Sequence, residues 1–329
     1  MRDLFYDKAR GIGIFLLVFG HIFPYESTVF AAIFSFHMPL FFIISGMLLN
    51  CHKEKGVFDI CLKTGISYTF FLIVGLFLLL VRILLGDFTL CGGGKNFIAE
   101  CFYIVGPDAG MVGSIWFLPI LGISQILALS LHKMKESHFC KCRLYDVGVI
   151  MFLAFCSIYV AAFLPSIFRV RTLFTTTLLV YLGVNWRNAI KKLVDSCPYK
   201  CLQLIVLVPL WFYIALSNRT VNVAVPVYNN YILFLLGALL GTYIVFLVSK
   251  FKFVNFVAFW GRNSLIIFAT HGIWLYVCRV IEPYFELSYQ SEFYCFYSVA
   301  SVAIIILCIP TYYFFKPLFS VYRTALMKR

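Results

Sequence analysis

Charged residues are scarce in this sequence: they make up 12% of its 329 residues, against about a quarter in a typical soluble domain. Hydrophobic residues make up 62%, and the mean hydropathy is +0.94. So little polar surface excludes both a soluble globular protein and an intrinsically disordered chain. The 12 cysteines are too few, for this length, to indicate a small disulfide-stapled scaffold. The composition indicates a polytopic membrane protein, with the lipid bilayer as its partner.

The sequence also lacks internal repeats and polar linkers, so we expect one integral-membrane domain over residues 1–329. A helix needs about 20 mostly apolar residues to span a bilayer. The apolar runs that predict spans are 11–24, 30–49, 66–85, 115–131, 147–164, 172–185, 202–217, 231–249, 264–281 and 293–314. No small-residue cleavage site follows the first run, which we therefore interpret as an uncleaved span. The prediction is an all-α protein with about ten transmembrane helices.

The charges that are present are mostly basic, and their positions predict the orientation. The chain has 27 Lys and Arg against 14 Asp and Glu, a formal net charge of +13. With ten spans and a cytoplasmic N-terminus, the inside segments contain 21 of the 27 basic residues. The outside loops contain only Lys95, Arg169, Arg171 and Arg219. By the positive-inside rule both termini are cytoplasmic, and no nucleic-acid partner is needed to explain the charge.

The first candidate site lies in the first predicted span. Arg10 and His21 are 11 residues apart, close to three helical turns, so their side chains share one face about 16 Å apart along the axis. Arg10 would lie at the cytoplasmic mouth, His21 deep in the membrane, and Asp7 one turn before Arg10. The alternatives are a positive-inside anchor for Arg10 and an interhelical hydrogen bond for His21. Their shared face favours a pathway with a charged entrance and a titratable end.

The second candidate site lies in the second predicted span. Pro39 lacks a backbone donor and predicts a kink that frees carbonyl groups near His37. Such a kink would place His37 where two spans open around a cavity. Ser45 and Gly46 follow, and the alternative for them is close helix packing.

Two later segments supply further candidates. Trp116 opens the fourth span, where an interfacial belt role is the common one for tryptophan. Asn263 and Ser264 enter the ninth span, either as candidate site residues or as a helix cap. His271 lies seven residues beyond Ser264, nearly on the same helical face.

These segments together resemble a known family. The opening DKARGI at 7–12 with His21, the HMPLFF at 37–42 with Ser45, Trp116 with its neighbours, and GRNSL at 261–265 with His271 occur in the order found in the integral-membrane acyltransferase family 3. The resemblance covers nearly the whole chain. In general character the chain is similar to the branch containing fucose 4-O-acetyltransferases and surface-polysaccharide O-acetyltransferases.

The resemblance implies an O-acetyltransferase, multi-pass in the plasma membrane of a bacterium. It implies transfer of an acetyl group from cytoplasmic acetyl-CoA to a sugar hydroxyl of a surface polysaccharide or its lipid-linked precursor. Arg10 and the lysines Lys53, Lys55 and Lys63 would hold the CoA phosphates. Family members often carry a paired-arginine motif where these lysines occur, and lysine lacks the bidentate fork of arginine.

His21 is the predicted catalytic group, with Arg10 and Asp7 beside it. It would either deprotonate the acceptor hydroxyl or carry the acetyl group itself, and the sequence does not separate these routes. His37, Ser45, Trp116, Asn263, Ser264 and His271 are predicted to line the cavity or contact the acceptor. The alternative function is a transporter or flippase for a lipid-linked sugar or anionic solute, although no inverted repeat supports it. A receptor or structural protein would leave the ordered motifs unexplained.

The remaining polar segments predict no further chemistry. The segment 138–142 (HFCKC) lacks the paired spacing of a structural zinc site, so no metal is expected. Cys91 and Cys101 lie in a predicted outside loop and would pair only in an oxidising compartment. The sequence identifies neither the acceptor sugar nor the oligomeric state.

Overall fold

The computed structural model describes residues 3–25, 27–51, 56–84, 113–137, 143–165, 167–196, 198–281 and 294–327. Within them the chain is almost entirely helical, apart from connecting turns and one isolated β-bridge between Asn222 and Val227. The α-helices are α1 (Leu4–Ile22), α2 (Thr28–Phe34), α3 (His37–Met47), α4 (Gly56–Leu84), α6 (Phe117–Ser137), α7 (Arg143–Phe155), α8 (Leu173–Asp195), α9 (Lys200–Ser217), α10 (Tyr231–Val248), α11 (Ala258–Arg262), α12 (Ser264–Ile281) and α13 (Tyr294–Met327).

Short turns of other helix types extend several of these. They are the 3₁₀ segments η1 (Gly113–Trp116), η3 (Ala161–Phe163), η4 (Ile167–Thr172) and η5 (Lys252–Val257), and the π-helical segment η2 (Cys156–Val160). The arrangement confirms an all-α polytopic membrane protein. Each of the ten predicted spans coincides with a helical segment, although α4 begins before the predicted start at 66 and α13 continues past the predicted end at 314.

In the described part of the chain, seven helical stretches are long and apolar enough to cross a membrane. An eighth candidate is the pair formed by η5–α11 and α12, which is bent by 80°. The other two predicted spans correspond to α1 and α8, which do not pass this test. The first turns of α1 contain Asp7, Lys8 and Arg10, and the second half of α8 is polar. α1 is enclosed by α3, α11, α12 and α13. The apolar first half of α8 is enclosed by α3 and α6, whereas most of its polar second half is exposed. A helix shielded from lipid tolerates polar residues that a lipid-facing helix does not.

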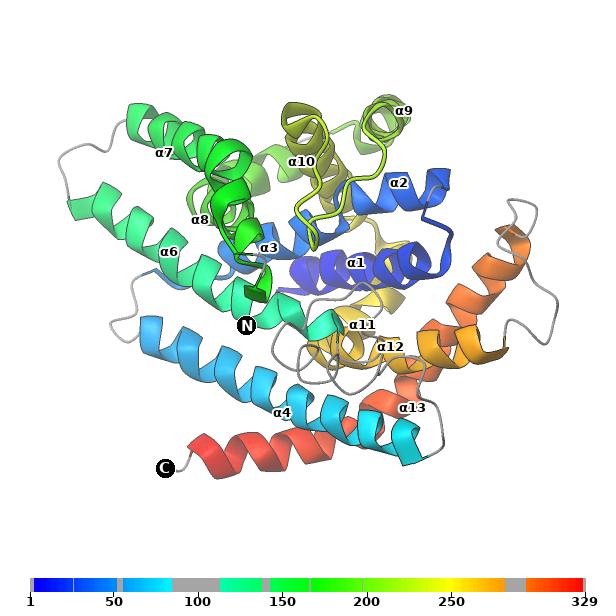
Figure 1. The fold of residues 1–329 in the computed structure, drawn as a ribbon. Coiled ribbons are helices and arrows are strands. Elements are labelled where there is room, and N and C mark those ends of the chain that lie inside the picture. Colours follow the sequence, from blue (N-terminus) through cyan, green and yellow to red (C-terminus); the bar gives the residue numbers. More distant parts are fainter. Residues whose placement is uncertain are drawn as a thin grey trace.

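The centre of the molecule is α3, which lies beside α1 in Figure 1. Every residue of α3 except Ser45 is buried. A Cβ added at Gly46 would overlap the backbone carbonyl of Val180 in α8, and one added at Gly183 would overlap the carbonyl of Ile43. The two glycines therefore let the backbones of α3 and α8 touch, which confirms the packing interpretation for Gly46.

A second close contact joins α1 to α11. A Cβ at Gly11 would overlap the carbonyl of Val257, and one at Gly261 would overlap the carbonyl of Asp7. The buried Lys8 strengthens the contact, because its Nζ donates to the carbonyl of Phe251 at 3.0 Å and to Asn255 Oδ1 at 3.1 Å. The start of α1 is thereby fixed against the bent pair that leads into α12.

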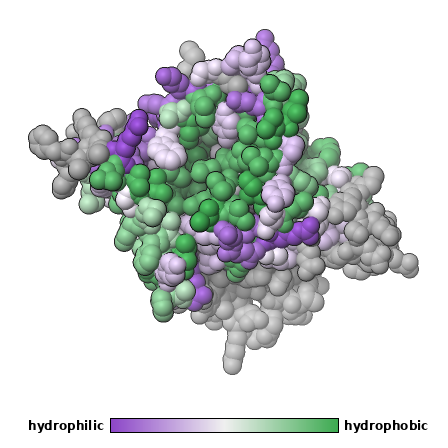
Figure 2. Space-filling view, turned by 90° about the horizontal axis from the view of Figure 1, so that it is seen from above, coloured by the Kyte–Doolittle hydropathy of each residue, from purple (hydrophilic) through white to green (hydrophobic). Residues whose placement is uncertain are grey.

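The outer surface of the bundle is apolar. On α9 and α7, large exposed side chains such as Ile205, Tyr213, Leu144 and Met151 point away from the core. Figure 2 shows a broad hydrophobic area on one face, with hydrophilic residues gathered toward its margins. An exposed apolar area of this size is the surface expected to face lipid. In Figure 1 α1 begins and α13 ends toward the same side, as an even number of crossings requires.

Candidate active site

Three histidines from three helices meet in the structure. His21 lies in the last turn of α1, His37 is the first residue of α3, and His271 lies in the middle of α12. The ring centroid of His21 is 5.4 Å from that of His271, with the planes 29° apart, and 6.4 Å from that of His37, nearly perpendicular. We call His21, His37 and His271 the histidine cluster. Residues 250 positions apart in the sequence are thus brought into ring contact.

The three rings differ in exposure and in their hydrogen bonds. His37 and His271 are each 2% exposed, whereas His21 is exposed. His37 Nδ1 lies 3.0 Å from the carbonyl oxygen of Ile33, and His271 Nδ1 lies 2.6 Å from that of Phe268. A carbonyl oxygen only accepts, so in each buried ring Nδ1 donates and, in the neutral form, Nε2 is an acceptor. The exposed ring is the one a substrate can reach, and the two buried rings form its fixed surroundings.

The break before His37 explains how one buried ring is positioned. The second span is interrupted at Ser35 and Phe36, one turn before Pro39, and the carbonyl of Ile33 accepts from the His37 ring. A proline ring clashes with the carbonyl four residues earlier, here that of Ser35. The predicted kink therefore corresponds to a break on the N-terminal side of the proline. The Ile33 carbonyl is not left free there, since it accepts from the Phe36 N–H at 3.2 Å as well as from the His37 ring.

Aromatic rings that the sequence patterns did not single out surround the cluster. Phe34 lies 4.6 Å from His37 and 5.6 Å from His21 between ring centroids, and Phe268 lies 5.9 Å from His271. Phe117 packs against Phe268 at 5.2 Å. These rings restrict the orientations of the imidazoles. A sequence with 37 phenylalanines gives no signal that would have selected these three.

Arg10 and Asp7 lie on the same helix as His21, nearer its start. α1 is continuous from Leu4 to Ile22, so the predicted shared face of Arg10 and His21 is present in the structure. Arg10 is half-buried, and Asp7 is 4% exposed at the contact between α1 and α11. The helix thus joins a cationic first half to an imidazole in its last turn.

Several predicted site residues lie away from the cluster. Ser45 is two turns beyond His37 on α3, and Ser264 is two turns before His271 on α12. Asn263 ends α11, and its Nδ2 donates to the carbonyl of Phe259 at 2.8 Å. This bond holds the C-terminal end of α11 and is not the predicted cap at the start of the ninth span. Lys63 is exposed on α4, and the predicted Lys53 and Lys55 lie outside the described residues, as do Cys91 and Cys101.

Trp116 differs from the interfacial belt residue that its position favoured. It is 8% exposed in η1, and the guanidinium carbon of Arg169 lies 5.9 Å from the centroid of its ring. Arg169 Nη1 donates to the carbonyl of Ala224, so the pair joins η1 to η4 and to the turn before α10. Burial lowers the pKa of Arg169 to about 10. Trp116 is part of a buried contact and does not lie at a lipid boundary.

Comparison with known proteins places the chain in a family. A family model described as an acyltransferase domain, that of the acyltransferase 3 family, matches residues 3–313. Neither a curated protein nor a solved structure matches the chain. The matched region includes all three rings of the histidine cluster and the whole of α1. The chain belongs to the integral-membrane acyltransferase family 3 and is a membrane acyltransferase.

Proposed function

We propose that the protein transfers an acetyl group from cytoplasmic acetyl-CoA to a sugar hydroxyl of a surface polysaccharide or its lipid-linked precursor, in the plasma membrane of a bacterium. The observation that carries this proposal is the histidine cluster, in which the one exposed ring is held between two buried ones. An accessible imidazole is the usual group for moving a proton to or from a hydroxyl. The family membership supplies the reaction class.

In the proposed reaction His21 takes the proton of the acceptor hydroxyl as its oxygen attacks the thioester carbonyl. The carbon–sulfur bond then breaks, the acetyl group stays on the sugar oxygen, and the proton passes to the thiolate of CoA. Asp7 and Arg10 lie nearer the predicted cytoplasmic end of α1, where Arg10 helps to bind the phosphates of the donor. Lys53, Lys55 and Lys63 contribute to the same cationic entrance.

His37 and His271 hold the reacting ring. Their neutral imidazoles, each fixed through Nδ1 to a carbonyl, present acceptor nitrogens beside His21 without adding charge. Trp116, Ser45, Asn263 and Ser264 keep only supporting roles in the proposal. Ser45 and Ser264 lie about two turns from the cluster along their helices, Asn263 donates to the end of α11, and Trp116 packs against Arg169.

The proposal is tested with radiolabelled acetyl-CoA and membranes that contain the protein. His21→Ala should reduce label transfer to lipid-linked or polymeric sugar by at least about 100-fold, the usual contribution of a general base. Its abundance and melting temperature in detergent should match those of the wild type, because His21 is exposed. Full activity of the His21→Ala protein would contradict the proposed role of His21 as the general base.

The same assay separates the remaining alternatives. Label that appears on the protein when the acceptor is left out, and is lost in His21→Ala, would indicate an acetyl-histidine intermediate. Sugar translocation that does not depend on acetyl-CoA would indicate the transporter or flippase.

A further inference from the structure

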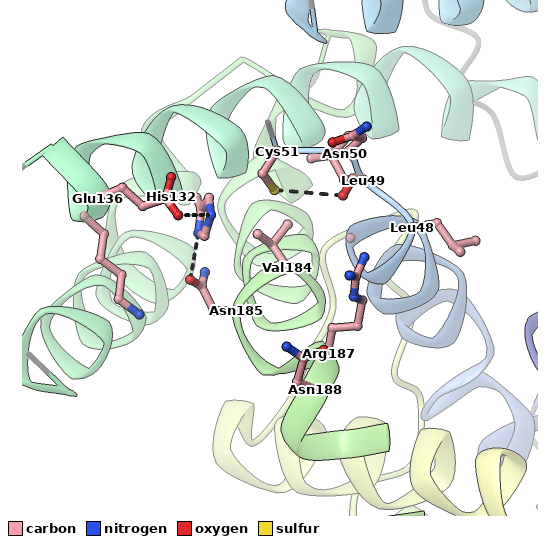
Figure 3. Close-up of a pocket in the computed structure, with 12 residues that line it drawn as sticks. Leu48, Leu49, Asn50, Cys51, His132, Glu136, Val184, Asn185, Arg187 and Asn188 are labelled. Carbon is pink, nitrogen blue, oxygen red and sulfur yellow. Dashed lines mark hydrogen bonds and ion pairs between the residues drawn. The ribbon is translucent and has the colours of Figure 1, made fainter. Parts of the chain in front are cut away.

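A cavity of about 740 Å³ opens between the ends of α3, α6 and α8, away from the histidine cluster. Figure 3 shows that Arg187 and Asn188 line it from α8, and His132 and Glu136 from α6. Its volume lies in the range of small-molecule and cofactor sites. The basic residues Lys135 and Arg187 that line it belong to segments predicted to face the cytoplasm. The cavity is therefore on the side from which a cytoplasmic donor would arrive.

Carboxamide side chains line the cavity, and one of them is placed to meet a ligand. Both ends of the Asn185 carboxamide are already used, since its Oδ1 lies 2.9 Å from His132 Nδ1 and its Nδ2 donates to the carbonyl of Tyr181 at 3.1 Å. The exposed Asn188 is the carboxamide that the cavity offers to a ligand. Carboxamides pair with the edge of adenine through one donor and one acceptor. Val184 and Leu48 add apolar area against which a flat ring can lie. These groups suit a purine better than a simple anion.

The charges in the cavity leave one guanidinium available for phosphate. Lys135 pairs with Asp146 at 2.7 Å, and Glu136 lies 3.4 Å from His132. Arg187 is exposed, and its Nη1 donates to the carbonyl of Met47 at 3.2 Å. That contact covers the carbonyl end of α3, which would otherwise repel an anion. The other N–H groups of the Arg187 guanidinium remain to bind a phosphate.

The thiol in the cavity wall is not a competing nucleophile. Burial, followed by the nearby Glu136 carboxylate, raises the pKa of the Cys51 thiol above its ordinary value. The thiol is therefore protonated near neutral pH and acts as a small apolar part of the wall.

The separation between the cavity and the histidine cluster matches the length of a CoA arm. His37 begins α3 and Leu48 follows its last residue, so the two sites are about 16 Å apart along the helix axis at 1.5 Å per residue. The pantetheine arm of CoA has about 12 backbone bonds between its phosphate and its sulfur, which span about 15 Å when extended. A nucleotide held in the cavity would place its thioester at the depth of His21.

We propose that this cavity binds the adenosine 3′,5′-bisphosphate end of the CoA thioester, with the carboxamide of Asn188 on the base and Arg187 on a phosphate. The inference rests on the proposed function, which takes acetyl-CoA as the acetyl donor. It adds a binding site on α3, α6 and α8 to the cationic residues of α1 and α4.

An isosteric charge change tests the cavity without removing a contact that holds the helices. Asn188→Asp places a carboxylate in the cavity, and Ala189→Asp places one at the next, exposed position on α8, which does not line it. Asn188→Asp should raise the KM for acetyl-CoA about tenfold by repulsion, with the KM for the acceptor unchanged. Ala189→Asp should leave both unchanged. Equal KM values for acetyl-CoA in the two variants would overturn the proposal.

Binding of adenosine 3′,5′-bisphosphate provides a second test that needs no catalysis. The His21→Ala protein should bind this nucleotide as tightly as the wild type, as measured by calorimetry in nanodiscs. Adding Arg187→Gln to this protein should weaken nucleotide binding at least about tenfold, the loss expected for a bidentate phosphate contact. The control is Lys192→Gln, because Lys192 is exposed on α8 but lies outside the cavity, and this change should leave nucleotide binding unchanged. Binding that is absent in the wild type, or independent of Arg187, overturns the cavity assignment even if His21-dependent acetylation stands. Absence of acetyl transfer from acetyl-CoA overturns the proposed function, and the nucleotide titration still decides the cavity.

Discussion

His21 differs from the other two histidines of the cluster in the feature that catalysis needs, which is access. Its ring is exposed at the end of α1, while His37 and His271 are enclosed by Phe34, Phe268 and the backbone that accepts from them. A group that exchanges a proton with substrate has to be reachable, and a group that positions it has to be fixed. In the proposed mechanism these two tasks fall to one exposed and two buried imidazoles.

This division predicts the behaviour of His271→Asn. The carboxamide keeps a donor for the Phe268 carbonyl but removes the ring that stacks on His21 at 5.4 Å. We expect kcat to fall about 10- to 100-fold, the usual cost of a displaced catalytic group, with little change in the KM for acetyl-CoA. Steady-state kinetics in membranes measures both values. A rise only in the KM for the acceptor would instead place His271 in contact with the sugar, which is the role predicted from the sequence.

His37→Asn is the matched substitution on the other side of His21. The same reasoning predicts a smaller loss in kcat, because the rings of His21 and His37 meet edge to face at 6.4 Å and share less area. The two variants together show whether stacking, rather than the mere presence of an imidazole, holds the catalytic ring. A larger loss in His37→Asn than in His271→Asn would contradict this ranking.

Among the elements, the contact between α1 and α11 decides where α1 lies, and α1 holds His21, the proposed catalytic residue. It depends on Gly11 and Gly261, since a Cβ at either position would overlap a backbone carbonyl of the other helix. Backbone cannot move aside as a flexible side chain does. The glycine of the GRNSL segment is therefore explained by packing, and the bend of 80° that follows it turns α12 so that His271 reaches His21.

We accordingly expect Gly261→Ala to separate α1 from α11 and to lower stability by about 1–3 kcal/mol, as overpacking does. Acetyl transfer should fall as well, because α1 holds His21. The control is Gly65→Ala on α4, where an added Cβ meets nothing within 4 Å and where alanine should be neutral or stabilising by about 0.5–1 kcal/mol. Melting temperatures of the two proteins in detergent give the comparison. Equal melting temperatures would show that the helices adjust without cost.

The elements also show what could and could not be predicted from the sequence. The shared face of Arg10 and His21 follows from helical periodicity alone, and the break beside Pro39 follows from the chemistry of proline. The meeting of His21 with His37 and His271 depends on how three helices pack, which no local pattern encodes. The burial of Trp116 could not be predicted either, because lipid and protein interior favour the same apolar residues.

At the scale of the whole molecule, the composition predicted a membrane protein. The positions of the basic residues predict that both termini are cytoplasmic, and therefore that the chain crosses the membrane an even number of times. Among the helices that correspond to predicted spans, α1 and α8 fail the test of apolarity. Their polar residues carry the proposed chemistry: α1 holds Arg10 and His21, and α8 holds Arg187 at the cavity. Hydropathy underestimates α1 because neighbouring helices enclose it. It underestimates α8 because an enclosed apolar half continues into an exposed polar half.

The crossing of α1 and α8 can be tested by thiol labelling in intact cells. Tyr25 follows α1 and Tyr199 follows α8, and both side chains are well exposed, at 49% and 70%. With ten spans and a cytoplasmic N-terminus, Tyr25→Cys should react with a membrane-impermeant maleimide from outside. Tyr199→Cys should react only after the membrane is opened. The native cysteines, including Cys91 and Cys101 of the predicted outside loop, are replaced by serine in both proteins.

The four outcomes of this labelling are distinct because the two sites report on different helices. Tyr25→Cys that is shielded in intact cells would mean that the end of α1 does not reach the outer side, and the pathway from Arg10 to His21 would not cross the bilayer. Tyr199→Cys that reacts from outside would place the far end of α8, with Arg187 about two turns before it, on the outer face. In that case a cytoplasmic nucleotide could not reach the cavity. Labelling of Tyr25→Cys alone in intact cells is the result that the positive-inside distribution requires.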